Sequence, residues 1–264
     1  MKFTKMQGLG NDYVYVDCIH QDPGDLNELA RRVSERHFGV GSDGLICICP
    51  SETADFRMRM FNADGSEGEM CGNGIRCMGK FVYDKGLTDK TELAIETLGG
   101  PRYLSLQVED GKVSAVTVDM GAPVIDPPQT IAVKGIPYTG IPVSMGNPHY
   151  VIEVADPAVL DLEDIGPAFE HFEYFPNRTN TEFVRPLAPN EVQMRVWERG
   201  SGETMACGTG ACATVVAMAV SGRLDREATV HLLGGDLHIR WDEESGHVFM
   251  TGPAVTSFEG ELPD

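Results

Sequence analysis

The sequence predicts an α+β fold built from two copies of one unit, and three observations support this prediction. The segments RMRMFNADGSEGEMCGNG (57–74) and QMRVWERGSGETMACGTG (193–210) align without a gap at a spacing of 136 residues, which separates Cys71 from Cys207. The same spacing relates two further pairs, Gly10-Asn11 with Gly146-Asn147 and Gly86 with Gly222. Each copy also has one apolar helix candidate just after its cysteine. An internal repeat of this length indicates a duplicated structural unit.

The local patterns specify the elements of each copy. Short runs with β-branched and aromatic alternation are typical of strands; they include YVYVD (13–17), HYVIEV (149–154), VQMRVW (192–197) and LHIRWD (237–242). The helix candidates after the two cysteines are 74–86 and 210–222, and the second is apolar on nearly every face, so it must be buried all round. We therefore predict two pseudo-twofold related domains, each of mostly antiparallel strands wrapped around a central buried helix. Two further helices, within 26–39 and 158–172, are expected outside.

The domain boundary is predicted from the repeat and from turn-forming residues. The segment GAPVIDPPQT (121–130) is turn-rich and is typical of a linker. Residues 1–120 are accordingly expected to form an N-terminal half that carries Cys71, and residues 121–264 a C-terminal half that carries Cys207. The prediction leaves room for the last residues to return to the first half.

Composition excludes several classes of protein. A formal net charge of −19 disfavours binding to nucleic acid or to an anionic membrane surface. No apolar run approaches the roughly 20 residues that span a bilayer, and the N-terminus has no secretory signal, so a cytoplasmic protein is expected. Seven cysteines, an odd number, predict thiols rather than disulfides. Their spacing fits no zinc pattern, so no metal is expected.

The two repeated cysteines carry the predicted chemistry. Cys71 and Cys207 each precede a Gly-x-Gly sequence at the start of a buried helix. Backbone N–H groups and the helix dipole there bind anions, and they are expected to lower the pKa of a thiol. Two such thiols with two anion-binding turns suit the inversion of a carbon that carries a proton. One thiolate removes the proton, the other thiol returns one, and the N–H groups stabilise charge on the carboxylate.

These segments resemble the diaminopimelate epimerase family. NADGSEGEMCGNGIRC (62–77) resembles the signature around the first catalytic cysteine, and WERGSGETMACGTGACA (197–213) that around the second. KMQGLGNDYVYVD (5–17), RHFGVGSDGLI (36–46), SMGNPHYVI (144–152) and NRTNTEF (177–183) extend the resemblance over almost the whole chain. It implies interconversion of LL- and meso-diaminopimelate in lysine and peptidoglycan synthesis. It also implies a homodimer and the absence of pyridoxal phosphate and metal.

The resemblance also implies roles for individual residues. Cys71 and Cys207 are the acid–base pair, and Gly72-Asn73 and Gly208-Thr209 hold the reacting carboxylate through backbone N–H groups. The groups that hold the amines and the distal carboxylate are Asn11, Asn62, Asn147, Asn180, Glu198 and Arg199. His149 and Glu198 tune the thiols. Some members of the family have Gln where this chain has Gly44, so a substrate contact from that side chain is absent here.

Other functions remain open on the residues alone. A proline or hydroxyproline racemase shares the two-thiol plan, but its cyclic substrate has no distal groups to occupy Asn62, Asn147, Asn180 and Arg199. A thiol–disulfide oxidoreductase is expected to have a CxxC motif, which is absent. A cysteine hydrolase gives no reason for a second copy. A non-catalytic binding module requires both thiols to be incidental, and alkylation of either cysteine with loss of epimerisation separates an enzyme from such a module.

Overall fold

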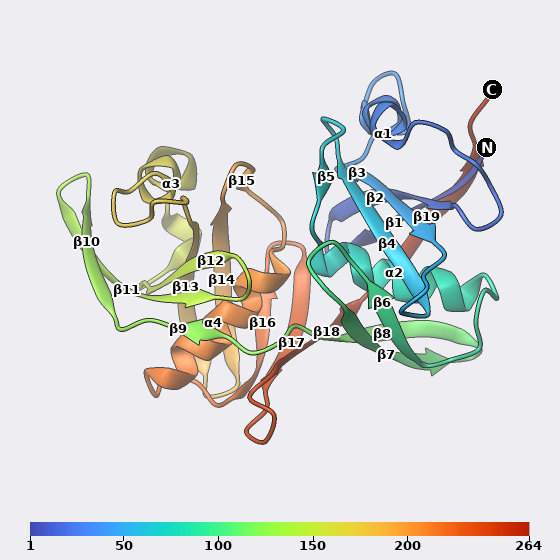
Figure 1. Cartoon of the computed structure of the whole chain (residues 1–264). Coiled ribbons are helices and arrows are strands. Elements are labelled where there is room, and N and C mark those ends of the chain that lie inside the picture. The colour runs from blue at the N-terminus through green and yellow to red at the C-terminus, as the bar shows by residue number, and fades with distance from the viewer. Residues whose placement is uncertain (264) are drawn as a thin grey trace. The chain divides into compact units, whose positions relative to one another are not determined.

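The computed structural model describes residues 1–263, which divide into two compact units. Unit 1 comprises Met1–Val118 and the segment that begins at Gly252, and unit 2 comprises Asp119–Thr251. The final segment therefore belongs to the same unit as the N-terminus, and Figure 1 shows both chain ends there.

Unit 1 is a row of strands curled around one helix. Its strands are β1 (Lys2–Gly8), β2 (Asn11–Asp17), β3 (Gly44–Cys49), β4 (Phe56–Asn62), β5 (Glu67–Gly68), β6 (Glu92–Glu96), β7 (Arg102–Glu109), β8 (Lys112–Asp119) and β19 (Val255–Glu261), and its helices are α1 (Leu26–Ser34) and α2 (Gly72–Asp84). They pair in the order β19-β1-β2-β3-β4-β6-β7-β8, with only β2/β3 and β4/β6 parallel. Helix α2 packs against β1, β2 and β3 and also against β7, so distant strands of the row enclose the same helix.

Unit 2 repeats this arrangement. Its strands are β9 (Val124–Ile125), β10 (Gln129–Val133), β11 (Ile136–Ser144), β12 (Pro148–Glu153), β13 (Asn180–Ala188), β14 (Glu191–Glu198), β15 (Gly202–Glu203), β16 (Glu227–Leu232), β17 (Gly235–Trp241) and β18 (Val248–Pro253). Its helices are η1 (Pro157–Val159), α3 (Leu162–Glu170) and α4 (Gly208–Val220). The main row runs β11-β12-β13-β14-β16-β17-β18, again with two parallel pairs, β12/β13 and β14/β16.

The main strands and the central helix of the two units correspond, which confirms the predicted α+β architecture of strands around one buried helix. The parallel pairs occur at equivalent places in both rows. An ion pair also recurs at the spacing of 136 residues: Arg59 binds Glu67 at 2.8 Å in unit 1, and Arg195 binds Glu203 at 2.7 Å in unit 2. These pairs join the short strands β5 and β15 to β4 and β14, just before each cysteine, which explains why the sequence repeat is densest there.

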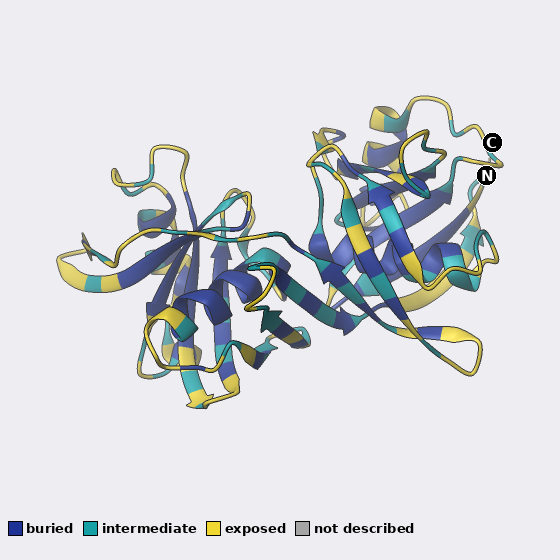
Figure 2. Ribbon diagram, turned by 60° about the horizontal axis from the view of Figure 1, so that its bottom comes forward, coloured by how far each residue is buried: buried dark blue, intermediate teal, exposed yellow. Residues whose placement is uncertain are grey.

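The central helices begin and end in the same way. Each starts directly after a cysteine, two residues earlier than predicted, and α4 is buried through its first ten residues except Thr209 (Figure 2). Each ends two residues before a left-handed glycine, Gly86 at φ 73° and Gly222 at φ 70°. The residue that follows each glycine donates its N–H back into the last turn, to Val82 and to Met218, as in a Schellman cap. The repeated glycines therefore terminate the helices.

The remaining repeated glycines place two asparagines. Gly10 (φ 86°) and Gly146 (φ 97°) form the turns that lead into β2 and β12, where a side chain would strain the backbone. Asn11 and Asn147 follow these turns directly. The predicted linker 121–130 is not wholly irregular, because β9 pairs with β11 and so extends the sheet of unit 2. Among residues 1–263, no helix has the length and apolar character needed to cross a membrane.

Candidate active site

Cys71 and Cys207 cap the two central helices. Both have extended backbones, with φ −125° and ψ 121° at Cys71 and φ −113° and ψ 111° at Cys207. Each sulfur accepts the N–H of the residue three positions on, Gly74 or Gly210, at 3.4 Å. The first turn of a helix presents N–H groups that no carbonyl within the helix accepts. Each unit thus combines a thiol with a backbone turn suited to an anion.

In unit 1 the Cys71 thiol is oriented by Asn11. The Cys71 Sγ donates to Asn11 Oδ1 at 3.2 Å, and Asn11 Nδ2 donates to Asp43 Oδ2 at 2.8 Å. Asp43 therefore fixes which end of the asparagine amide faces the sulfur. Tyr13 lies beside them, and burial together with the neighbouring Cys71 raises the pKa of its hydroxyl well above the usual value.

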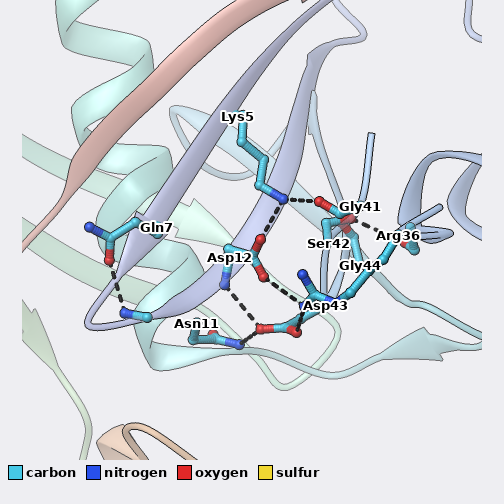
Figure 3. A network of polar contacts seen from close by, with 11 residues as sticks. Lys5, Gln7, Asn11, Asp12, Arg36, Gly41, Ser42, Asp43 and Gly44 are labelled. Atoms are coloured by element: carbon cyan, nitrogen blue, oxygen red, sulfur yellow. Dashed lines mark hydrogen bonds and ion pairs between the residues drawn. The ribbon is translucent and has the colours of Figure 1, made fainter. Parts of the chain in front are cut away.

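A network of charged groups holds Asp43 in place (Figure 3). Arg36 Nη2 lies 2.8 Å from Asp43 Oδ1 and 3.2 Å from Asp12 Oδ1. The Asp12 N–H donates to Asp43 Oδ2 at 3.0 Å, and the buried Lys5 ammonium lies 2.5 Å from the second oxygen of Asp12. Asp43 was not among the predicted site residues, although it lies in the segment 36–46 that resembles the family. Its role is to position Asn11.

In unit 2 a buried histidine joins a carboxylate to an asparagine. His149 Nδ1 lies 2.7 Å from Glu182 Oε1, and Nε2 lies 3.1 Å from Asn147 Oδ1. The side chains of His149 and Glu182 are both 0% exposed. Asn147 Nδ2 in turn donates to the hydroxyl of Thr209, in the first turn of α4, at 3.3 Å. The chain of contacts runs from Glu182 through His149 to the start of the helix that Cys207 caps.

Burial and nearby carboxylates affect the protonation of Cys207. Burial raises the pKa of the Cys207 thiol well above its ordinary value, and the charges of Glu198 and Glu182 raise it further. Hydrogen bonds from Thr209 and from the Gly210 N–H act in the opposite direction but are weaker. Burial likewise raises the pKa of Glu198, although hydrogen bonds from Thr204 and Cys207 lower it.

The predicted lowering of the thiol pKa is therefore wrong for Cys207 in the substrate-free protein. The helix start stabilises the thiolate as expected, but loss of hydration and two nearby carboxylates outweigh it. The sequence pattern showed the glycine turn and did not show that Glu182, on β13, lies beside the sulfur.

Asn62 and Asn180 are two further predicted binding residues, one in each unit. Asn62 is exposed at the end of β4, where its Nδ2 donates to Ser66 Oγ at 3.0 Å. Asn180 is buried, and both ends of its amide are engaged: Nδ2 donates to the Pro148 carbonyl at 2.7 Å and Oδ1 accepts the Arg199 N–H at 2.9 Å. Asn180 therefore holds β12, β13 and the end of β14 together.

The predicted contact Arg199 and the position Gly44, which was not predicted to bind substrate, differ in how much space surrounds them. The Arg199 side chain is exposed and donates once, to the Asn177 carbonyl at 3.1 Å, which leaves most of its five N–H donors for a ligand. Gly44 pairs with Asn62, and a β-carbon there would lie 2.1 Å from the Phe61 carbonyl oxygen and 2.9 Å from a Tyr13 ring carbon. A larger residue at position 44 would therefore require the neighbouring strand to shift.

The surroundings of Cys71 and Cys207 have the same backbone arrangement but differ in the charge of the neighbouring side chains. A β-carbon on Gly74 would meet Ile46 Cδ1 at 2.6 Å, and one on Gly210 would meet Glu182 Oε1 at the same 2.6 Å. Three positions at the spacing of 136 residues differ between the units: Tyr13 corresponds to His149, Ile46 to Glu182, and Asn62 to Glu198. Cys207 therefore lies beside a histidine and two carboxylates, which the equivalent positions in unit 1 do not supply to Cys71. A comparison of Ile46 with Glu182 was the signal in the sequence that could have identified Glu182.

The influence of Glu198 on Cys207 can be measured by alkylation. Removing its charge in Glu198→Gln lowers the pKa of Cys207, because a nearby anion disfavours the thiolate. More thiolate is then present at a given pH, and the thiolate is the reactive form. The pH profile of Cys207 alkylation by iodoacetamide, followed by peptide mass spectrometry, is expected to move to lower pH. Glu191→Gln, at the exposed far end of β14, is the control; an unmoved profile in Glu198→Gln contradicts the assignment.

Solved structures of other proteins share this fold. A Bacillus anthracis phenazine biosynthesis protein of the PhzF family matches with a TM-score of 0.76 at 20% identity, covering 100% of this chain and 99% of that one. A hydroxyproline epimerase from Agrobacterium vitis, solved with bound trans-4-hydroxy-L-proline, matches with a TM-score of 0.76 at 15% identity, covering 98% and 91%. At these identities the likeness is one of fold.

The sequence comparison is more specific. The family model described as diaminopimelate epimerase matches residues 3–125 and 141–257. The diaminopimelate epimerase of Methanococcus maripaludis (strain C5) is 54% identical over 99% of both chains, and that of Acetivibrio thermocellus is 53% identical over 99% of this chain and 98% of its own. The chain belongs to the diaminopimelate epimerase family, and it is an isomerase.

Proposed function

We propose that the chain interconverts LL- and meso-diaminopimelate without a cofactor, with Cys71 and Cys207 as acid and base on opposite faces of the reacting carbon. The observation that carries this proposal is the duplicated half-site: in each unit a cysteine caps the central helix above a Gly-rich turn. The names of relatives at 53–54% identity support the substrate.

The proposed reaction moves one proton at each face. One thiolate takes the Cα proton, so an S–H bond forms as the C–H bond breaks, and the electron pair passes into the carboxylate. The N–H groups at the starts of α2 and α4 stabilise that charge. The other thiol then gives its proton to the opposite face, which forms the inverted C–H bond. The raised pKa favours the protonated form of Cys207, which is the form that returns a proton when Cys71 is the base.

Substrate binding supplies a reason for Cys207 to change its protonation state. Glu198 is the predicted partner of a substrate ammonium group, and its charge is one of the causes that raise the pKa of Cys207. An ammonium bound there offsets that charge. The thiol thus becomes a stronger acid only when a substrate with a correctly placed amine is bound, which favours an amino-acid substrate.

Arg199 is the proposed contact of the distal carboxylate. Its planar guanidinium can bind a carboxylate through two parallel hydrogen bonds, which Lys cannot reproduce. Arg199→Lys is expected to weaken kcat/KM for diaminopimelate by roughly 10- to 150-fold, equivalent to about 1.5–3 kcal/mol for a charged hydrogen bond. Steady-state kinetics measure this, with Arg178→Lys as the neighbouring control. Unchanged kinetics in Arg199→Lys remove that residue from the site.

The substrate is tested by comparing two amino acids. Purified protein is incubated with LL-diaminopimelate and, separately, with L-proline, and the stereoisomers are resolved by chiral chromatography. We expect conversion of diaminopimelate to a mixture of LL and meso forms and none of L-proline. Conversion of L-proline alone would instead assign the function of a proline racemase.

The resemblance also supports a place for the enzyme in the cell. We propose a cytoplasmic homodimer that acts in lysine and peptidoglycan precursor synthesis, with no nucleic-acid or membrane partner. Sedimentation equilibrium tests the dimer: a mass of one chain across micromolar concentrations contradicts it.

A further inference from the structure

Three side chains in unit 2 bring together a nitrogen, an oxygen and a sulfur that can ligate a metal. His149, Glu182 and Cys207 each offer one ligand atom, and these atoms all lie within 4.8 Å of one another. All three residues are buried. They come from three different elements, β12, β13 and the N-cap of α4, so the packing of the unit, and not a local sequence motif, assembles the set.

A second observation points to a cation. Glu182 Oε2 is buried and has no hydrogen-bond partner among the described residues, whereas Oε1 contacts His149. A buried carboxylate oxygen without a donor is costly, and a positively charged ligand is one way to satisfy it. Glu198, which also contacts Cys207, adds a second carboxylate and increases the negative potential at the same place.

We propose that His149, Glu182 and Cys207 form a binding site for a thiophilic divalent cation. Zn²⁺ is the cation whose ligand preferences best match this set. Zn²⁺ takes thiolate, imidazole and carboxylate ligands at about 2.3, 2.0 and 2.1 Å, which places neighbouring ligand atoms roughly 3.3–3.8 Å apart. Because the ligand atoms lie within 4.8 Å of one another, the widest pair needs to close by at most about 1.5 Å to reach this geometry. Binding replaces the S–H proton, which leaves to solvent, with a Zn–S bond, and a water completes four ligands.

The site is confined to unit 2. At the positions equivalent to His149 and Glu182, unit 1 has Tyr13 and Ile46, which supply neither an imidazole nor a carboxylate. One Zn²⁺ per chain is therefore expected. A zinc-bound Cys207 cannot exchange a proton with substrate, so the ion is also expected to inhibit; this consequence alone rests on the proposed function, and the binding does not.

The binding is tested directly with Zn²⁺. Metal-free protein is titrated against a chromophoric chelator, and Co²⁺ is added separately to look for a thiolate-to-cobalt absorption band. The wild type is expected to bind one Zn²⁺ and to show the band. Cys207→Ser and Glu182→Gln are each expected to weaken binding at least roughly tenfold, as loss of even an outer-shell partner can. Cys71→Ser, the matched variant in unit 1, is expected to bind as the wild type does.

The outcomes separate the site from its alternatives. Cys207→Ser exchanges one atom and is the variant least prone to misfold; near-ultraviolet circular dichroism and the thermal midpoint check that it and Glu182→Gln are folded. Undiminished Zn²⁺ affinity in folded Cys207→Ser places the ion elsewhere, such as at a surface histidine, and overturns the proposal. Loss of binding in Cys71→Ser, or no binding by the wild type, overturns it equally. None of these readouts uses epimerase activity.

Discussion

Alanine in place of either Cys71 or Cys207 is expected to abolish epimerisation. Each thiol is proposed to perform one of two proton transfers, and a positioned acid or base contributes roughly 10²–10⁴-fold to a rate. Because inversion needs both transfers, neither thiol can compensate for the other. The measurement is conversion of LL- to meso-diaminopimelate by chiral chromatography, with thermal unfolding to show that each variant is folded.

Cys77→Ala is the matched control for these variants. Cys77 lies within α2, six residues after Cys71, and is fully buried away from the glycine turn at the helix start. This variant is expected to retain most activity and to lose some stability through the small cavity that it leaves. Near-full activity in Cys71→Ala or Cys207→Ala would remove that residue from the reaction.

Neutralising Glu182 is expected to have the second-largest effect. Its carboxylate holds His149 at 2.7 Å, and His149 contacts Asn147 beside the start of α4. A carboxylate that orients a catalytic histidine is worth up to about 10⁴-fold in serine proteases, and we expect Glu182→Gln to lower kcat at least about tenfold. Glu182 acts through its neighbours, so it is a positioning residue.

The pH dependence distinguishes this role from a purely structural one. The Glu182 charge raises the pKa of Cys207, so its removal lowers that pKa. The limb of the pH–rate profile that depends on Cys207 is expected to move to lower pH in Glu182→Gln and to stay in place in Glu191→Gln. A fall in kcat without any displacement of the profile would indicate a structural effect only.

Much of the fold could be predicted because the sequence repeats itself. The shared spacing of Gly86 and Gly222 reflects two left-handed helix caps, and that of Gly10 and Gly146 reflects two left-handed turns. These positions depend on local backbone geometry, which a sequence pattern encodes well. The placement of Cys71 and Cys207 at helix starts followed from the same reasoning.

The site was less predictable where it depends on contacts between distant segments. Glu182 lies 25 positions before Cys207 along the chain, and only the packing of β13 against α4 brings their side chains together. Asp43 is likewise visible as a positioning residue only once β2 and the loop before β3 are seen to meet. The expectation of no metal rested on the spacing of cysteines, which cannot reveal a ligand set drawn from three elements.

If two different thiols exchange protons with the two faces of the carbon, solvent deuterium will label substrate and product differently. LL-diaminopimelate is converted in D₂O for a small fraction of the reaction, and substrate and product are analysed by mass spectrometry. The account predicts that nearly every product molecule carries one deuterium at Cα, while the remaining substrate stays protonated. The thiol that returns a proton has exchanged with solvent, and the thiol that removed one holds hydrogen. Early deuterium in the remaining substrate, at a level equal to that in the product, would indicate a single exchanging base and would contradict the account.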